Sequence, residues 1–263
     1  MTRAVDLVVC AHGRSPYLDR CLASLEPQVG EGVALWVSTS TPNSHILRAA
    51  TQYRAQCVVN SKHEGIASDW NFALSVGAAP LVVLCHQDDE YAPTFSKRIA
   101  AAFDLAPDVL FAACDHTELS TLGPRAISLN LKIKRLLVSR VFKASGIQFG
   151  PSIRRRLLGW GNPLSCPSVM INRALVPDFQ FDRNFSSNLD WDAWERLARR
   201  PGYIAFVTEA LVAHRVHKQS ATTELIANSI RQAEDILMLR RFWPMPIAWL
   251  LFQAYRLAYR GND

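Results

Sequence analysis

The stretch VVLCHQDDEY, residues 82–91, decides the fold. It begins with an apolar run typical of a strand buried on both faces and ends in two adjacent carboxylates, Asp88 and Asp89. In a parallel α/β sheet, ligands bind just beyond the carboxyl ends of the strands. Carboxylates placed there can hold a hard divalent cation, which in turn neutralises a diphosphate. An isolated Asp-Asp pair can equally be a polar turn that caps the helix after Pro93, so the surrounding sequence has to decide.

Short apolar runs on both sides of this stretch alternate with amphipathic segments. The runs are VDLVVC (5–10), VALWVS (33–38), AQCVVN (55–60), PLVVLC (80–85) and VLFAAC (109–114). The segments between them predict helices near 15–25, 44–53, 64–77 and 93–106. This alternation predicts an α/β fold with a mainly parallel, Rossmann-like sheet flanked by helices.

The pattern changes after residue 115. Lys and Arg are interleaved with apolar residues over 130–158, and 161–172 reads as a turn that leads into a short strand. Residues 188–200 predict an amphipathic helix, 203–207 a strand, and 222–259 two helices broken at Pro244 and Pro246. We therefore expect one domain over 1–220, with halves 1–115 and 116–220, and a helical C-terminal extension over 221–263.

Composition excludes several classes of protein. A chain of 263 residues with 49% apolar and 20% charged residues is not disordered, collagen-like or a coiled coil. Six cysteines without C-x-x-C spacing indicate buried thiols in a reducing cytosol. The N-terminal run contains Asp6 and has no basic region before it, unlike a signal peptide, and the longest apolar run is half a membrane span. We expect a cytoplasmic protein, at most in contact with the inner membrane face. The basic stretch lacks the interleaved aromatic residues of a nucleic-acid reader.

Three segments resemble family 2 glycosyltransferases with the GT-A fold. VVCAHGRSPYLDRCLASL (8–25) and NSKHEGIASDWNFALSVGAAPLVVLCHQDDEY (60–91) look like the nucleotide-binding half of that family. The segment that starts with NLDWDAWERLARR (188–200) and continues to residue 223 is similar to its acidic helix and R-x-H segment. The matching residues are Gly13, Arg14, Tyr17, Leu18, Asn60, Gly65, Asn71, Asp88 and Asp89.

The resemblance implies transfer of a sugar from a nucleotide diphosphate-sugar to a glycan or a lipid-linked acceptor, with inversion, as in bacterial surface-polysaccharide assembly. It implies a divalent metal, Mn²⁺ or Mg²⁺, with Asp89 and His217 as ligands, although His217 is equally a candidate for direct contact with the diphosphate. Asp88 would face the ribose or the donor sugar, and Arg215 would support the phosphates. The residues implied to contact the donor are Ala11, His12, Arg14, Ser38, Asp69, Asp88 and Arg215.

Such a transfer also needs a base for the acceptor hydroxyl. Asp190 matches the second residue of the family's Glu-Asp pair, and the first residue is Leu189 here. Asp192 competes for the same role. Alternatively, a carboxylate at the start of a helix can have a purely structural role, in which it accepts hydrogen bonds from the free backbone N–H groups. The resemblance therefore favours Asp190 as the base.

The identity of the donor nucleotide is left open, because the end of the second predicted strand differs from the family pattern. The strand ends in VSTSTPNS (37–44), where the family carries acidic residues, one of which reads uracil. Hydroxyls can hydrogen-bond a base edge but do not supply an acceptor-only carboxylate. Asp69, on the helix after Gly65, is a candidate replacement.

Two rival functions and two surfaces stay open. A nucleotidyltransferase would need a glycine-rich basic loop after the first strand, which AHGRSPY (11–17) does not provide. A non-catalytic binding subunit is favoured by Leu189 and by the Ser/Thr run over 38–41, but it does not explain why the candidate acids and His217 are retained. The basic stretch is either an acceptor or membrane surface or a solvated helix face. The last helix is either interfacial or a packing element.

Overall fold

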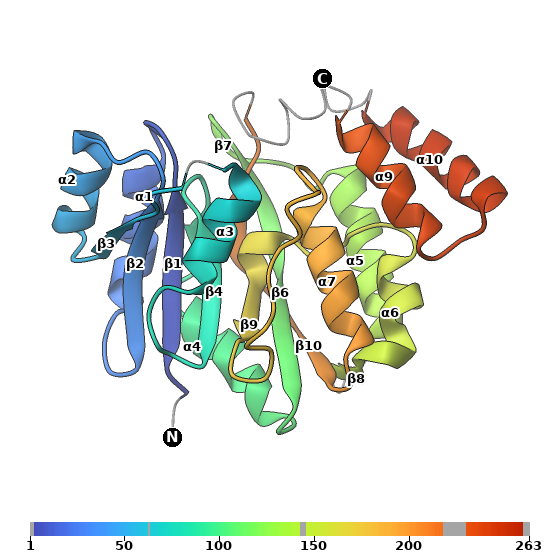
Figure 1. The fold of residues 1–263 in the computed structure, drawn as a ribbon, viewed down its shortest axis with the longest axis horizontal. Coiled ribbons are helices and arrows are strands. Elements are labelled where there is room, and N and C mark those ends of the chain that lie inside the picture. The colour runs from blue at the N-terminus through green and yellow to red at the C-terminus, as the bar shows by residue number, and fades with distance from the viewer. Residues whose placement is uncertain (1–2, 63, 143–145, 218–229, 260–263) are drawn as a thin grey trace.

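The strands form one continuous sheet. The computed structural model describes residues 3–62, 64–142, 146–217 and 230–259. Within them the strand order is β3-β2-β1-β4-β9-β6-β10-β5, with β7 beside β6 and β8 beside β10 (Figure 1). The strands are β1 (Val5–Ala11), β2 (Val33–Thr39), β3 (Gln56–Val59), β4 (Leu81–His86), β5 (Glu90–Tyr91), β6 (Val109–Ser120), β7 (Gly123–Pro124), β8 (Ile147–Phe149), β9 (Val169–Asn172) and β10 (Tyr203–Arg215).

The prediction of a mainly parallel sheet is confirmed. β1 pairs in parallel with both β2 and β4, so that Val8 lies opposite Trp36 and Leu84. β6 and β10 are also parallel to each other. The short strand β9 lies antiparallel between β4 and β6 and joins the two parallel parts. The predicted halves 1–115 and 116–220 therefore share one sheet.

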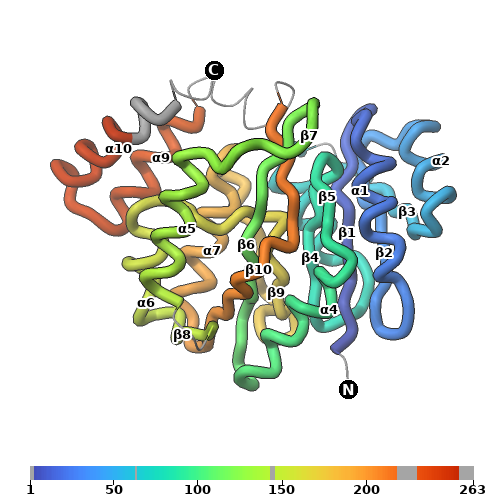
Figure 2. Tube along the Cα trace, turned by 180° about the vertical axis from the view of Figure 1, so that it is seen from behind, coloured from blue at the N-terminus to red at the C-terminus, as the bar shows by residue number. Residues whose placement is uncertain are grey.

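Helices cover both faces of this sheet and bury it. Leu7 and Val9 of β1 pack in one apolar cluster with α1, α2 and α4, and Val8 packs on the opposite face in a second cluster with α3, α5, α6 and α7. Since both faces are buried, the central strands consist of continuous apolar runs. In Figure 1 α3 and α7 lie in front of the sheet, and Figure 2 shows α1 and α4 on the other side. The helices are α1 (Leu18–Leu25), α2 (Ser44–Gln52), α3 (Ile66–Leu74), α4 (Phe95–Ala100), α5 (Leu129–Val141), α6 (Gly150–Leu158) and α7 (Leu189–Arg199).

The last two helices pack on this core. α9 (Ile230–Arg240) places Met238 and Leu239 fully inside the cluster that also contains α7. The turn after α9 is fixed by Trp243, whose indole Nε1 donates to the carbonyl of Gly159 at 2.5 Å. α10 (Met245–Tyr259) then runs back along α9, as Figure 2 shows. The predicted break near Pro244 is confirmed, and the predicted helix start at 222 lies outside the described residues.

Two simpler predictions concern the thiols and the membrane. All six cysteines are free thiols, as the missing C-x-x-C spacing indicated, but the prediction that they are buried holds for four of them and not for Cys10 and Cys57, which are partly exposed. In the described part of the chain, no helix combines the length and the apolar character that crossing a bilayer requires.

Candidate active site

The turn after β4 sends its two carboxylates in different directions. Asp89 points inward and is 1% exposed. Its carboxylate lies 3.0 and 3.2 Å from Nδ1 of His214 and accepts from the backbone N–H of Arg215 at 2.8 Å. Burial alone would raise the pKa of Asp89, but the charge and hydrogen bond of His214 lower it below its ordinary value. Asp89 therefore connects the end of β4 to the end of β10 as a buried ionised group.

Asp88 faces the open edge of the sheet. Its Oδ1 accepts from the Ser15 hydroxyl at 2.6 Å, and its Oδ2 lies 3.2 Å from Nε2 of His217. The ring of His217 is also held by Tyr17, with centroids 5.2 Å apart. The Asp88 side chain is 25% exposed, so it can still reach a ligand. A carboxylate oxygen and an imidazole nitrogen thus face each other at the carboxyl end of β4.

Arg215 holds the backbone of this turn. Its Nε donates to the carbonyl of Asp88 at 2.9 Å, and its other nitrogens bind Glu90 and the carbonyl of Ser120. The guanidinium lies 4.5 Å from the ring centre of Tyr17 and is 1% exposed. The sequence predicts contact between Arg215 and the donor phosphates, but the structure places this side chain beneath the site, where it positions Asp88.

The loop after β1 closes over the same edge. Ala11 ends β1, and the backbone of His12 exchanges two hydrogen bonds of 3.1 Å with the amide of Gln87. Gly13 has a φ of 61°, which favours glycine, and its N–H donates to the Thr41 hydroxyl at 2.7 Å. Arg14 is exposed at the tip of this loop. The loop therefore connects the ends of β1, β2 and β4, as the predicted donor site requires.

Asp69 lies next to the serine and threonine run. Its two oxygens accept from the Ser40 hydroxyl at 2.8 Å and from the Asn60 side-chain amide at 2.9 Å. Ser38 is buried nearby, with 4% of its surface exposed. The structure thus brings a carboxylate to the ends of β2 and β3, where the strand itself has none.

Asp190 stands at the start of α7 on the same edge of the sheet. Burial raises its pKa, and the charges of Arg231 and Lys134 offset part of that rise. The charges of both Asp190 and Asp89 act on the buried thiol of Cys166, so both carboxylates lie near it. The competing candidate, Asp192, is fully buried and held in ion pairs of 2.8 Å to Arg196 and 2.7 Å to Arg241. Asp190, by contrast, is partly exposed.

The loop before Asp190 is fixed by a residue that sequence reasoning missed. Glu234 of α9 accepts from the backbone N–H groups of Ser186, Ser187 and Asn188 at 2.7, 2.9 and 2.7 Å. Next to it, Asp235 accepts from the side chain of Asn188 at 2.8 Å. The adjacent acids in a helix were the only signal, and they do not show what the helix binds.

The donor set fits a divalent metal that is completed by its ligand. In the described residues no group of three His, Cys, Asp or Glu side chains converges closely enough to hold a metal. Asp88 and His217 offer one carboxylate and one imidazole. Mg²⁺ and similar ions are commonly held by one or two carboxylates together with substrate phosphates and water.

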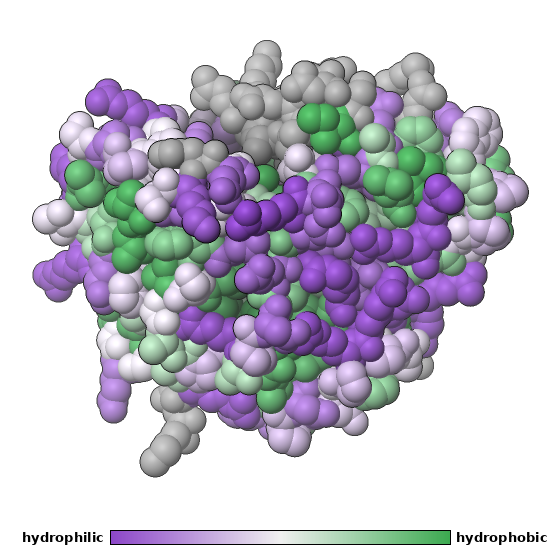
Figure 3. All heavy atoms as spheres, viewed as in Figure 1, coloured by the Kyte–Doolittle hydropathy of each residue, from purple (hydrophilic) through white to green (hydrophobic). Residues whose placement is uncertain are grey.

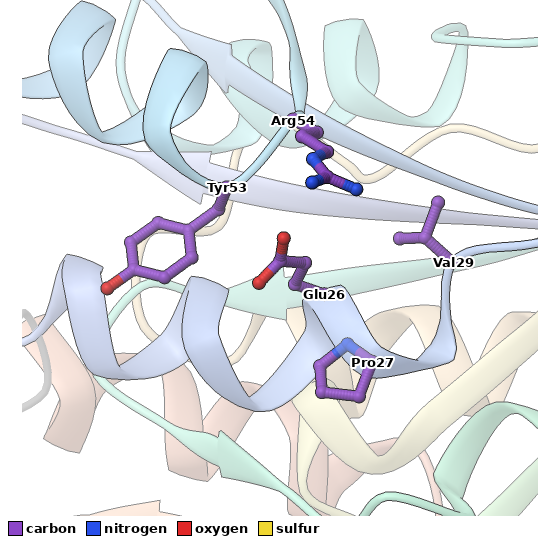
Figure 4. A pocket seen from close by; sticks show the side chains of 5 residues that line it. All are labelled: Glu26, Pro27, Val29, Tyr53 and Arg54. Atoms are coloured by element: carbon purple, nitrogen blue, oxygen red, sulfur yellow. The ribbon is translucent and has the colours of Figure 1, made fainter.

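A separate cavity lies away from this edge. Its volume is about 310 Å³, and the side chains that line it come from the segment after α1 and from the end of α2 (Figure 4). They are Glu26, Pro27, Val29, Tyr53 and Arg54. These residues precede β2 and β3, so the cavity is at the amino ends of the strands and contains none of the predicted site residues.

Solved structures with this mixed α/β fold include glycosyltransferases of the GT-A class. Mannosyltransferase PcManGT from Pyrobaculum calidifontis, solved with GDP-Man and Mn²⁺, has a TM-score of 0.66 at 14% identity and covers 97% of this chain and 70% of its own. S. aureus TarS 1–349 with UDP-GlcNAc has a TM-score of 0.63 at 15% identity, with coverages of 91% and 71%. Glucosyl-3-phosphoglycerate synthase from Mycobacterium tuberculosis, solved with Mn²⁺, UDP and glucosyl-3-phosphoglycerate, has a TM-score of 0.59 at 18% identity. The match covers 92% of this chain and 81% of the synthase chain.

The family model "Glycosyl transferase family 2" matches residues 6–159, which is more than half of the chain. The chain therefore belongs to glycosyl transferase family 2. A search of curated protein sequences gives no match. Membership supports glycosyltransferase activity and confirms the resemblance on which the sequence prediction rested.

Proposed function

We propose that this chain transfers a sugar from a nucleotide diphosphate-sugar to a hydroxyl of a glycan or lipid-linked acceptor, with inversion. One observation carries the proposal: a carboxylate with a raised pKa, Asp190, shares a sheet edge with the Asp88–His217 pair. Family membership supports the transfer. The complexes of similar folds with UDP-GlcNAc and GDP-Man support a nucleotide sugar as the donor.

We assign the metal ligands to Asp88 and His217 in place of the predicted pair Asp89 and His217. Both oxygens of Asp89 are engaged by His214, and one of them also by the backbone N–H of Arg215, whereas Asp88 is partly exposed and faces Nε2 of His217. A carboxylate together with an imidazole suits Mn²⁺ as well as Mg²⁺. When bound, the metal supplies positive charge for the leaving diphosphate.

The nucleoside side of the donor would lie over Asp69. This carboxylate and the hydroxyls of Ser38 and Ser40 stand at the ends of β2 and β3, next to the loop of Ala11, His12 and Arg14. Asp69 supplies an acceptor-only group that can hydrogen-bond a base or a ribose hydroxyl. Arg14, exposed at the tip of its loop, can reach the phosphates.

Asp190 would act as the base. The acceptor oxygen attacks C1 of the donor sugar while its proton passes to Asp190, and the bond from C1 to the phosphate oxygen breaks on the opposite face of the ring. That geometry inverts the configuration at C1. A raised pKa makes Asp190 a stronger base than an exposed aspartate, and general base catalysis of this kind contributes about 10²- to 10⁴-fold.

The acceptor side would face an anionic membrane surface. Between Glu118 and Asp178 the chain contains no acidic residue and many Lys and Arg residues. α5 exposes Leu129 and Leu136 beside Lys132 and Arg140, and α10 exposes Leu250. In Figure 3, hydrophobic residues interrupt the polar surface near α9 and α10. Each cation near an anionic bilayer contributes about 1 kcal/mol of attraction. The cytoplasmic location itself stays a prediction.

Thermal unfolding with UDP, GDP, CMP and dTDP, each with and without Mn²⁺, tests this proposal. A ligand that binds only the native state raises the melting temperature. At a ligand concentration of a hundred times its Kd, it adds about 2.7 kcal/mol to the free energy of unfolding. We expect a Mn²⁺-dependent shift with one nucleotide, lost in Asp88→Asn and kept in Asp178→Asn, a matched change at an exposed carboxylate paired with Arg200.

The same variants separate the rival functions. In Asp190→Asn we expect nucleotide binding without transfer of the sugar. Nucleotide binding by the wild-type protein with no transfer to any acceptor would favour a binding subunit, and release of inorganic diphosphate would indicate a nucleotidyltransferase. A shift that Asp88→Asn leaves intact would contradict our assignment of the metal ligands.

A further inference from the structure

A second cavity lies beside α5 and is lined in part by Lys134. Its volume is about 210 Å³, and it lies between α5, the middle of β6 and the first half of β10. Most of its wall is apolar, with contributions from Leu131, Val138, Phe142 and Phe206. Because a cavity of about 150 Å³ accommodates benzene, this one can hold a ring-sized group or a short stretch of alkyl chain.

Among the basic side chains that line the cavity, Lys134 is the one best placed to bind an anionic ligand. Arg135 is held by Asp115 at 2.8 Å and donates to the carbonyl of His116 at 3.0 Å. Burial lowers the pKa of His116 to about 3, so its ring is neutral near pH 7. Lys134 is partly buried and forms no ion pair with any residue that the structure describes. Burial lowers the pKa of Lys134, because it disfavours the charged ammonium, and an anion in the cavity would stabilise that charge.

Lys134 also connects the cavity to Asp190. It lines the cavity, and its charge lies close enough to Asp190 for each group to affect the pKa of the other. A molecule bound beside Lys134 would therefore lie near the base.

We propose that this cavity binds the part of the acceptor next to its reacting hydroxyl, and that this part is an alkyl or prenyl chain with a phosphate held by Lys134. This inference rests on the proposed function, and it names the class of acceptor. A bare sugar would leave hydroxyls without partners against Leu131, Val138 and Phe142. The outer side of α5, which exposes Leu129 at 74% and Ile133 at 48%, suits the bilayer from which such a lipid would come.

Binding of octyl phosphate in the absence of nucleotide tests the proposal directly. We expect calorimetric binding to the wild-type protein and at least a tenfold weaker affinity in Lys134→Met. Lys97→Met is the matched control, because Lys97 is an exposed lysine of α4, which packs on the other face of the sheet, and we expect it to bind as the wild type does. Val138→Phe fills the cavity without changing charge and should also weaken binding.

Two further ligands distinguish the sources of the signal. Octyl glucoside has the same chain without the charge, and inorganic phosphate has the charge without the chain, so we expect both to bind more weakly than octyl phosphate. Equal binding of octyl phosphate by Lys134→Met and the wild type would overturn the proposal. The proposal would also be overturned if inorganic phosphate bound as tightly as octyl phosphate, or if the nucleotide fully displaced octyl phosphate.

The outcomes separate this inference from the proposed function. Nucleotide binding without octyl phosphate binding rejects the lipid acceptor alone. Octyl phosphate binding that depends on Lys134, with no nucleotide bound by the protein, leaves a lipid-phosphate site and rejects the transferase mechanism.

Discussion

Replacing Glu234 by glutamine should damage both the stability of the protein and the position of its proposed base. The carboxylate is 6% exposed and accepts three backbone N–H groups in the loop before Asp190. Glutamine has the same shape, but only one of its terminal atoms can accept. In its better orientation the amide keeps the bonds to Ser187 and Asn188 and sets its NH₂ group against the N–H of Ser186.

The expected loss of stability follows from these bonds. Hydrogen bonds to charged groups are worth roughly 1.5–3 kcal/mol and neutral ones roughly 0.5–1.5 kcal/mol, so one lost and two weakened bonds cost about 3–5 kcal/mol. Asp190 follows Asn188 by two positions, and a displacement of about 1 Å in a catalytic group can cost about 10²-fold in rate.

Urea unfolding followed by tryptophan fluorescence, together with a transfer assay, measures both effects. Glu209→Gln is the control, because Glu209 forms an exposed ion pair with Arg98 and such pairs contribute about 1 kcal/mol or less. If Glu234→Gln unfolds within 1 kcal/mol of the wild type and retains full transfer, the assigned role of α9 is wrong.

Two other predictions concern single carboxylates. Because the folded-state pKa of Asp190 is raised, the unfolded chain ionises first as pH rises, and the protein loses stability between the ordinary pKa of an aspartate and the folded value. Asp190→Asn should therefore be more stable than the wild type at pH 7 but not at pH 3 in urea unfolding, and lower stability at pH 7 would refute the assigned burial. Asp69→Asn should raise the KM for the donor about tenfold with little change in kcat, since a hydrogen bond to a charged group is worth roughly 1.5–3 kcal/mol. An unchanged KM would show that the nucleoside does not bind at Asp69.

Much of the sheet could be predicted because its central strands are buried on both faces. The runs at 5–10, 33–38 and 80–85 became β1, β2 and β4 with ends shifted by a residue or less. The antiparallel direction of β9 was not predicted, since its neighbours β4 and β6 are remote in sequence and strand direction leaves no local pattern. The two- and three-residue strands β5, β7 and β8 are too short for any periodicity.

The site was predicted in its residue types more than in its geometry. Asp88, Asp89, Asp190 and His217 were all chosen from the sequence, and the structure places the three carboxylates and His217 at one edge. Which of two adjacent carboxylates points outward depends on the turn after β4, and no pattern in DDEY encodes that direction. The contacts of Arg215 and Glu234 join residues that are far apart in the chain, so local sequence patterns could not predict them.

The anchoring of the proposed base by α9 has a consequence for the order in which the parts of the proposed site form. A chain is synthesised from its N-terminus, so the strands that hold Asp88 and Asp69 leave the ribosome long before residue 234. The donor side of the nascent protein can form at that stage, while the loop before Asp190 still lacks the three hydrogen bonds that fix it. With Asp190 as the base, competence for transfer would come last, after binding, and a nascent chain that stops before α9 would bind a donor without acting on it.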